Sequence, residues 1–121
     1  MAWQFHGGES VYLQIVKRLR GQILSGQYPP DGQIPSVRLL ATEAAVNPNT
    51  MQKALTCLEE EGLLYTKGTL GRFVTSDGAV LDAARERVHR DAVRGWLLDA
   101  KQLGITPEEL IEYIKKEADE L

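Results

Sequence analysis

The feature that most constrains this 121-residue chain is a pair of short amphipathic segments joined by a tight turn, over residues 35–58. Ser36 can cap the first segment as a helix. Asn47 followed by Pro48 predicts the start of a second helix, because proline fits the first helical turn. The apolar residues of the first helix fall on one face: Val37, Leu40 and Ala41. The pattern predicts a helix-turn-helix.

The second helix of this pair has one apolar side and one polar side. Its predicted buried stripe is Met51, Ala54, Leu55 and Leu58, and its outward residues are Asn49, Thr50, Gln52 and Lys53. A helix-turn-helix places the opening residues of its second helix against base edges in the major groove. We therefore predict contact with double-stranded DNA. The alternative is a winged-helix module whose same residues dock a protein.

Composition excludes several other classes of protein. No apolar run approaches the roughly 20 residues needed to span a bilayer, so no membrane partner is expected. Cys57 is the only cysteine, which rules out an internal disulfide and favours the cytoplasm. His6 and His89 lack metal-ligand spacing, and no nucleophile stands near a base. We expect no metal, no cofactor and no enzymatic activity.

The net charge of −3 is unevenly distributed along the chain. Residues 1–76 carry seven Lys and Arg against six acids, a net +1. Residues 77–121 carry seven against eleven, a net −4. Salt screens charges more than about 10 Å away, so the acidic tail has little effect on a distant contact face. A chain that is acidic overall can therefore bind DNA phosphates through a locally basic face.

The segments around the helix pair predict a winged helix. In chain order they are a loose arm at residues 1–9, a helix at 10–25, a turn-rich connector at 26–35, and short strands at 64–67 and 72–75. Gly68 and Gly71 between the strands are a hairpin signal. We predict a mainly α fold with a small β-hairpin, and a winged-helix DNA-binding domain over residues 1–76.

Residues 77–121 predict a helical dimerisation region. A long helix stops at Gly104, and Thr106 with Glu109 forms a capping box that starts a shorter one. Two helices alone bury two apolar stripes poorly, so we expect a second copy to cover them. The predicted dimerisation residues are Val88, Trp96, Leu97, Leu103, Leu110, Ile111 and Ile114. A small effector between the tails, lined by Trp96 and Tyr113, is the alternative.

Arg38 and the hairpin are further candidates for DNA contact. Arg38 can pair with an acid, reach a phosphate, or donate two hydrogen bonds to guanine. The hairpin candidates are Lys67, Gly68, Thr69, Gly71 and Arg72, which would touch phosphates or the adjacent minor groove. An ordinary solvated turn is the alternative for the hairpin.

Several motifs match a known family in order along residues 10–75. They include Tyr12-Leu13-Gln14-Ile15, Ile34-Pro35-Ser36-Val37-Arg38, Val46-Asn47-Pro48-Asn49-Thr50, Gly62-Leu63, and Gly68 to Val74. With these motifs the chain resembles the GntR-type bacterial transcription regulators. The short tail, with Ala100 to Thr106 and Glu109-Leu110-Ile111, is similar to the YtrA subfamily, whose members have a two-helix dimerisation region.

This resemblance implies a homodimeric, sequence-specific regulator, commonly a repressor, that binds a palindromic operator. The family's DNA contacts would fall on Ser36, Arg38, Asn47, Asn49, Thr50 and Gln52, with Gly68, Thr69 and Gly71 in the wing. Many members outside the subfamily have arginine where this chain has Pro48 or Gln52. Base preference therefore does not transfer, and Gln52 could instead read adenine.

Overall fold

The computed structural model describes residues 2–121 as two compact units, one ending at Ala83 and the other spanning Ala84–Leu121. The first unit holds α1 (Val11–Leu24), α2 (Val37–Ala44), α3 (Pro48–Glu60), β1 (Leu64–Lys67), β2 (Gly71–Val74) and the start of α4 (Gly78–Gln102). The second holds the rest of α4 and α5 (Pro107–Glu120). The predicted winged helix followed by two C-terminal helices is confirmed.

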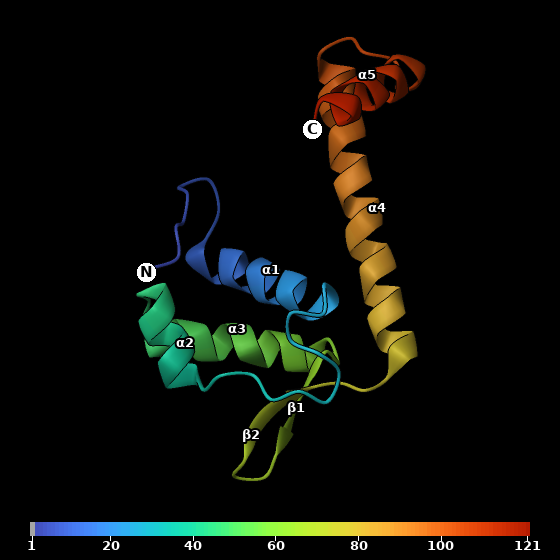
Figure 1. The fold of residues 1–121 in the computed structure, drawn as a ribbon. Helices are drawn as coiled ribbons and strands as arrows, with labels where there is room; N and C mark the ends of the chain where they lie inside the picture. Colours follow the sequence, from blue (N-terminus) through green and yellow to red (C-terminus); the bar gives the residue numbers. More distant parts are fainter. Residues whose placement is uncertain (1) are drawn as a thin grey trace. The chain divides into compact units, whose positions relative to one another are not determined.

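The core of the first unit lies between its three short helices. Figure 1 shows α1 alongside α3, with α2 against the same helix. The predicted stripe of α3 forms the floor of this core, since Met51, Leu55 and Leu58 are all 0% exposed. Arg20 on α1 donates to both carboxylate oxygens of Glu61, at 2.9 and 2.6 Å, and joins α1 to the end of α3.

The hairpin is wider than its two strands because the connector pairs with it. β1 and β2 run antiparallel, with Leu64 opposite Val74 and Lys67 opposite Gly71. The Ile34 N–H donates to the Arg72 carbonyl at 3.0 Å, and Gln33 forms a bridge with Phe73. Residues 26–35 are rich in turns, as predicted, but the sequence did not indicate this pairing. The prolines and Gly32 are turn signals, yet a short extended segment next to them lies along β2.

The N-terminal arm was predicted to be loose, and for residues 2–9 this is wrong. The Gln14 side chain accepts from the His6 N–H at 3.0 Å and donates to the carbonyls of His6 and Glu9 at 2.8 Å. The Trp3 ring lies 4.2 Å from the guanidinium carbon of Arg18. A glutamine amide and a cation–π contact hold the arm against α1 where the sequence has no periodic pattern.

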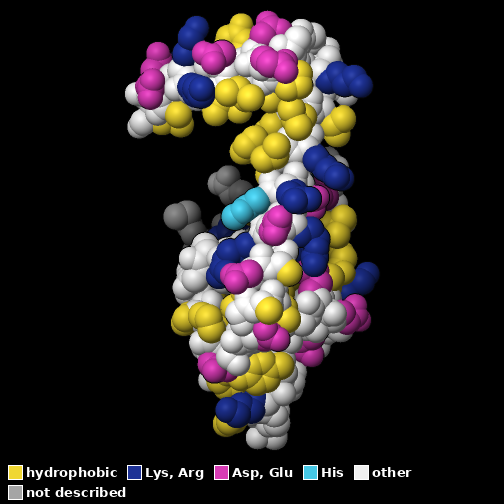
Figure 2. Space-filling model, turned by 90° about the vertical axis from the view of Figure 1, so that its right-hand side faces the viewer, with side chains coloured by type: hydrophobic (Ala, Val, Ile, Leu, Met, Phe, Trp, Pro, Cys, Tyr) yellow, Lys and Arg dark blue, Asp and Glu magenta, His cyan; other side chains and the backbone are white. Residues whose placement is uncertain are grey.

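The second unit is two helices joined by a sharp turn at Gly104, whose φ is +76°. The predicted capping box is present, since the Thr106 side chain accepts from the Glu109 N–H and the Glu109 side chain accepts from the Thr106 N–H. Figure 2 shows apolar side chains gathered along one side of α5 and on the adjoining part of α4. No helix within residues 2–121 is long and apolar enough to cross a membrane.

Candidate nucleic-acid interface

The turn between α2 and α3 fixes the geometry of the predicted reading helix. Ala45 is the C-cap of α2; it has a left-handed backbone with φ 58° and donates its N–H to the carbonyls of Ala41 and Thr42. Two residues later the Asn47 side chain accepts from the Asn49 N–H at 2.7 Å and caps α3. Both predicted caps are confirmed, because the Ser36 hydroxyl likewise accepts from the Leu39 N–H at 3.2 Å. The turn itself is bounded by the C-cap of α2 at Ala45 and the N-cap of α3 at Asn47, which leave it little freedom.

The outward side of α3 is polar over its first two turns. Asn49, Gln52 and Lys53 are exposed and Thr50 is half-buried. The Lys53 ammonium lies 4.7 Å from the centre of the Tyr12 ring, a cation–π contact between α3 and α1. Sequence reasoning missed Thr56, which is also exposed and lies one turn after Gln52 on the same stripe.

The hairpin, termed the wing and comprising Leu64–Val74, presents a subset of its predicted residues. Lys67, Gly68 and Thr69 are exposed, and Gly71 is half-buried with a φ of +122°. Gly71 thus has a backbone conformation that other residues rarely adopt.

Arg72 is less available for DNA contact than the sequence indicated, because it is paired within the protein. Its Nε donates to Glu59 on α3, and the Thr66 hydroxyl donates to the same carboxylate oxygen at 3.0 Å. Glu59 therefore joins both strands of the wing to α3. Sequence reasoning missed it because it belongs to a run of three acids, Glu59 to Glu61, that reads as a solvated helix end.

A groove of about 350 Å³ connects the start of α2 with the wing. It is lined by Gln33, Ile34, Pro35, Ser36, Val37, Arg38, Leu70, Gly71 and Arg72. Arg38, at the edge of this groove, is exposed. The start of α2 and the wing are thus neighbours, although more than thirty residues separate them in the chain. A phosphate backbone passing here would meet the Ser36 cap, Arg38 and wing backbone together.

Two tyrosines at the margins of this surface have raised pKa values. The Tyr65 hydroxyl donates to Asp31 Oδ1 at 2.9 Å, and this hydrogen bond raises the pKa of Tyr65, with burial and the Asp31 charge adding to it. The hydrogen bond with Cys57 is the main reason that the pKa of Tyr12 is raised. Both shifts favour the neutral phenol, so the two side chains stay neutral to a higher pH than an unperturbed tyrosine.

Within the part of the chain that the structure describes, no group of three or more His, Cys, Asp and Glu side chains could hold a metal ion. Each of α2, α3 and the wing carries an exposed cationic side chain: Arg38, Lys53 and Lys67. Their chemistry suits anionic backbone oxygens and base edges.

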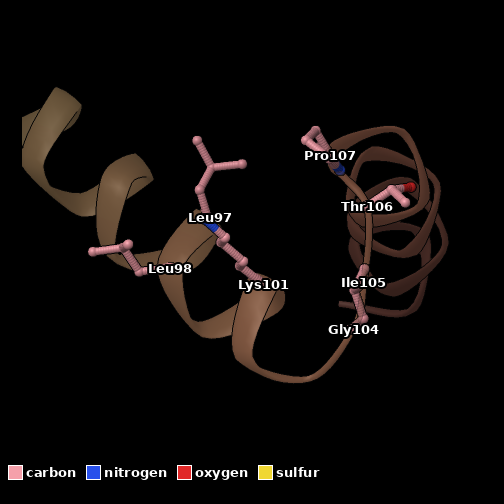
Figure 3. A pocket seen from close by; sticks show the side chains of 7 residues that line it. All are labelled: Leu97, Leu98, Lys101, Gly104, Ile105, Thr106 and Pro107. Atoms are coloured by element: carbon pink, nitrogen blue, oxygen red, sulfur yellow. The ribbon is translucent and has the colours of Figure 1, made fainter.

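The predicted dimerisation residues are largely uncovered in the isolated chain. Val88, Trp96, Leu97, Leu103, Ile111 and Ile114 are exposed and Leu110 is half-buried. Beside them lies a hollow of about 570 Å³, lined by Leu97, Leu98, Lys101, Gly104, Ile105, Thr106 and Pro107 (Figure 3). Trp96 and Tyr113, which the alternative of a small effector would place in its site, do not line this hollow.

Comparison with known proteins gives consistent matches. The family model for bacterial regulatory proteins, gntR family, matches residues 11–74. The HTH-type transcriptional regulator YhcF of Bacillus subtilis is 31% identical over 112 residues, which cover 93% of this chain and 93% of YhcF. The HTH-type transcriptional repressor YtrA of the same organism is 32% identical over 107 residues, covering 88% of this chain and 82% of YtrA.

The same likeness is present in three dimensions. The solved structure of a GntR family transcriptional regulator from Listeria monocytogenes matches with a TM-score of 0.87 and 31% identity. The match covers 93% of this chain and 98% of that chain, so it includes the tail as well as the winged helix.

Proposed function

Since the chain belongs to the gntR family of bacterial regulatory proteins, we propose that it works as a homodimer that binds an inverted-repeat operator and represses transcription. Family membership makes it a DNA-binding transcription regulator and not an enzyme. We propose repression because YtrA, which is similar to this protein over most of both chains, is a transcriptional repressor. We expect this binding to take place in the cytoplasm.

One observation carries the proposal for DNA contact. The opening of α3, Arg38 and the tip of the wing are exposed, and one groove is lined by both Arg38 and the wing. We propose that Asn47, Asn49, Thr50, Gln52 and Lys53 lie in the major groove. Ser36 would set the register on phosphates, and Arg38 would choose a base or hold a phosphate. The wing residues would touch phosphates or the adjacent minor groove: Lys67, Gly68, Thr69 and Gly71. Arg72, already paired with Glu59, would position the wing.

The proposal of a homodimer depends on the tail. The apolar side of α5 and the end of α4 are exposed in one chain, and large exposed apolar patches mark interaction sites. A second copy presents the same surface, which is the geometry of a two-fold interface. We propose that residues 77–121 dimerise while residues 1–76 bind DNA. Two joined reading heads would contact half-sites about one DNA turn apart, roughly 34 Å, or a multiple of it.

Selection of bound duplexes from a random pool tests the proposal directly. The expected result is an enriched inverted repeat, bound by two copies of the chain, with an affinity that falls steeply as salt rises. A reporter gene placed behind the enriched sequence should be repressed when the protein is expressed. Absence of any preferred sequence would contradict the proposal and favour the protein-interaction module.

A further inference from the structure

The tip of the wing contains a close approach between a glycine and a side chain from the connector. A Cβ added at Gly71 would lie 2.9 Å from Nε2 of Gln33, closer than real Cβ atoms come. Gly71 also has a φ of +122°. The absence of a side chain at Gly71 therefore leaves room for the Gln33 amide beside the wing backbone.

Gln33 contacts the wing at two levels. Its side-chain Nε2 donates to the Leu70 carbonyl at the tip, at 2.5 Å. Its backbone forms a bridge with Phe73 in β2, nearer the base of the hairpin. One residue thus holds both the stem and the tip of the wing.

The same residue leads directly into α2. Gln33 is followed by Ile34, whose N–H donates to the Arg72 carbonyl at 3.0 Å, and then by the Ser36 cap and Arg38. Gln33, Arg38 and Leu70 line one groove. A side chain that fixes the wing tip is therefore anchored to the segment that fixes the predicted reading residue Arg38.

From this arrangement we propose that Gln33 is a positioning residue: it holds the wing tip beside Arg38 and so sets how sharply the protein distinguishes the base pairs under the wing. The proposal rests on the proposed function, because it assigns a role to the wing in operator binding. Gln33 itself need not touch DNA. It acts through the Leu70 carbonyl.

The physical reason is that a short two-stranded hairpin is marginally stable by itself. Glu59 fixes the strands through Thr66 and Arg72, but both of these residues lie in the stem. Leu70, with its side chain 63% exposed, lies beyond that clamp. Without the bond from Gln33, the tip would sample several positions, and each would meet different base pairs.

Replacing Gln33 with Met tests the role of the donor, because methionine keeps the unbranched length of the side chain but cannot donate. Gln33→Asn is a second variant, which keeps the amide on a side chain one methylene shorter. Gln27→Met, an exposed glutamine in the same connector, is the matched control. Thermal unfolding of the full chain establishes that each variant is folded.

The first measurement uses the free protein and needs no DNA. The ¹⁵N heteronuclear NOE of Thr69, Leu70 and Gly71 should match that of β2 in the wild type and in Gln27→Met. In Gln33→Met and Gln33→Asn it should fall at these three residues while β2 keeps its values. An unchanged NOE at the tip in both Gln33 variants would overturn the proposal.

The second measurement uses the duplex that the wild type enriches from a random pool, together with all its single base-pair variants. Base pairs under the wing are identified as those where Thr69→Ala loses preference, and those under α3 as those where Gln52→Ala loses preference. Gln33→Met should lose roughly 2- to 10-fold of its discrimination at the first set and keep it at the second. Equal loss at both sets, or no loss, would overturn the proposal.

The two measurements separate this inference from the proposed function. If the wild type enriches no duplex, the proposed function fails, and the free-protein NOE still decides whether Gln33 orders the tip. If the wild type enriches an inverted repeat while Gln33→Met behaves like Gln27→Met, the proposed function stands and the role of Gln33 is wrong.

Discussion

The two units of this protein differ in how far their apolar side chains are buried. Of the nineteen buried hydrophobic residues in the described chain, seventeen lie before Ala84, and the other two are Ala84 and Ala100. Of its fourteen exposed large hydrophobic residues, ten lie in Ala84–Leu121. The winged-helix unit therefore contains its own core, whereas the tail has apolar surface without a core. The first unit thus holds almost all of the buried core, and the second presents the surface on which we propose that a second copy packs.

The largest expected effect sharpens the first half of this comparison. Leu55→Ala removes a fully buried side chain and should lower the free energy of unfolding by about 2–5 kcal/mol. The control is Leu39→Ala on α2, where the leucine is 50% exposed and the change should stay within about 0.5 kcal/mol. Urea unfolding followed by circular dichroism measures both. Similar losses of unfolding free energy in the two variants would mean that Leu55 does not belong to the core.

The second prediction tests the tail. Ile114→Asp puts a charge on the apolar side of α5, where the isoleucine is 46% exposed in one chain. We expect monomers in light scattering and an operator affinity lower by roughly 100-fold or more, because two linked heads gain affinity by effective concentration. Lys116→Asp on the polar side of α5 should remain dimeric. Dimers that persist in Ile114→Asp would break the comparison.

Arg38→Ala should leave both units folded while weakening specific DNA binding. Arg38 is exposed, so the thermal unfolding midpoint should hardly change, yet specific binding should weaken by about 1–3 kcal/mol. The matched control is Arg90→Ala on α4, an arginine whose side chain is 73% exposed and pairs with Glu86. Competition binding to the enriched duplex measures the difference. Equal affinity in wild type and Arg38→Ala would remove Arg38 from the interface.

The smallest expected effect is a pH dependence confined to the first unit. The pKa of Tyr65 is raised in the folded state, chiefly by its hydrogen bond to Asp31. The stabilisation is therefore complete below the pKa of the unfolded chain, about 10, and is lost as pH rises through the folded value. Between pH 8 and 11 the unfolding midpoint of the wild type should fall further than that of Tyr65→Phe. Parallel curves would show that this hydrogen bond contributes nothing.

The fold could be predicted from the sequence because its helices follow regular rules. The apolar spacing of Met51, Leu55 and Leu58 identified the buried side of α3, and Ser36, Asn47 and Thr106 marked helix starts through local capping. Each of these signals lies within a few residues of its consequence. The exposure of the α3 opening followed from the same periodicity.

The contacts that the sequence did not reveal are long-range and polar. Gln33 reaches Leu70 across thirty-seven residues, and Arg72 reaches Glu59 on another element. Gln14 holds the N-terminal arm through hydrogen bonds to backbone carbonyls. None of these pairs has a spacing rule, because side-chain hydrogen bonds depend on where the folded backbone brings their partners. The pairing of Arg72 with Glu59 was not predicted for this reason.

The left-handed backbone of Ala45 has a practical consequence for work on this protein. An L-residue with a side chain is strained at a φ of 58°, whereas glycine adopts that conformation freely. Ala45→Gly would thus be a thermostabilising substitution, with a gain of about 1 kcal/mol, at a site outside the proposed DNA contacts. With this added stability, interface variants that destabilise the protein could still be purified and compared.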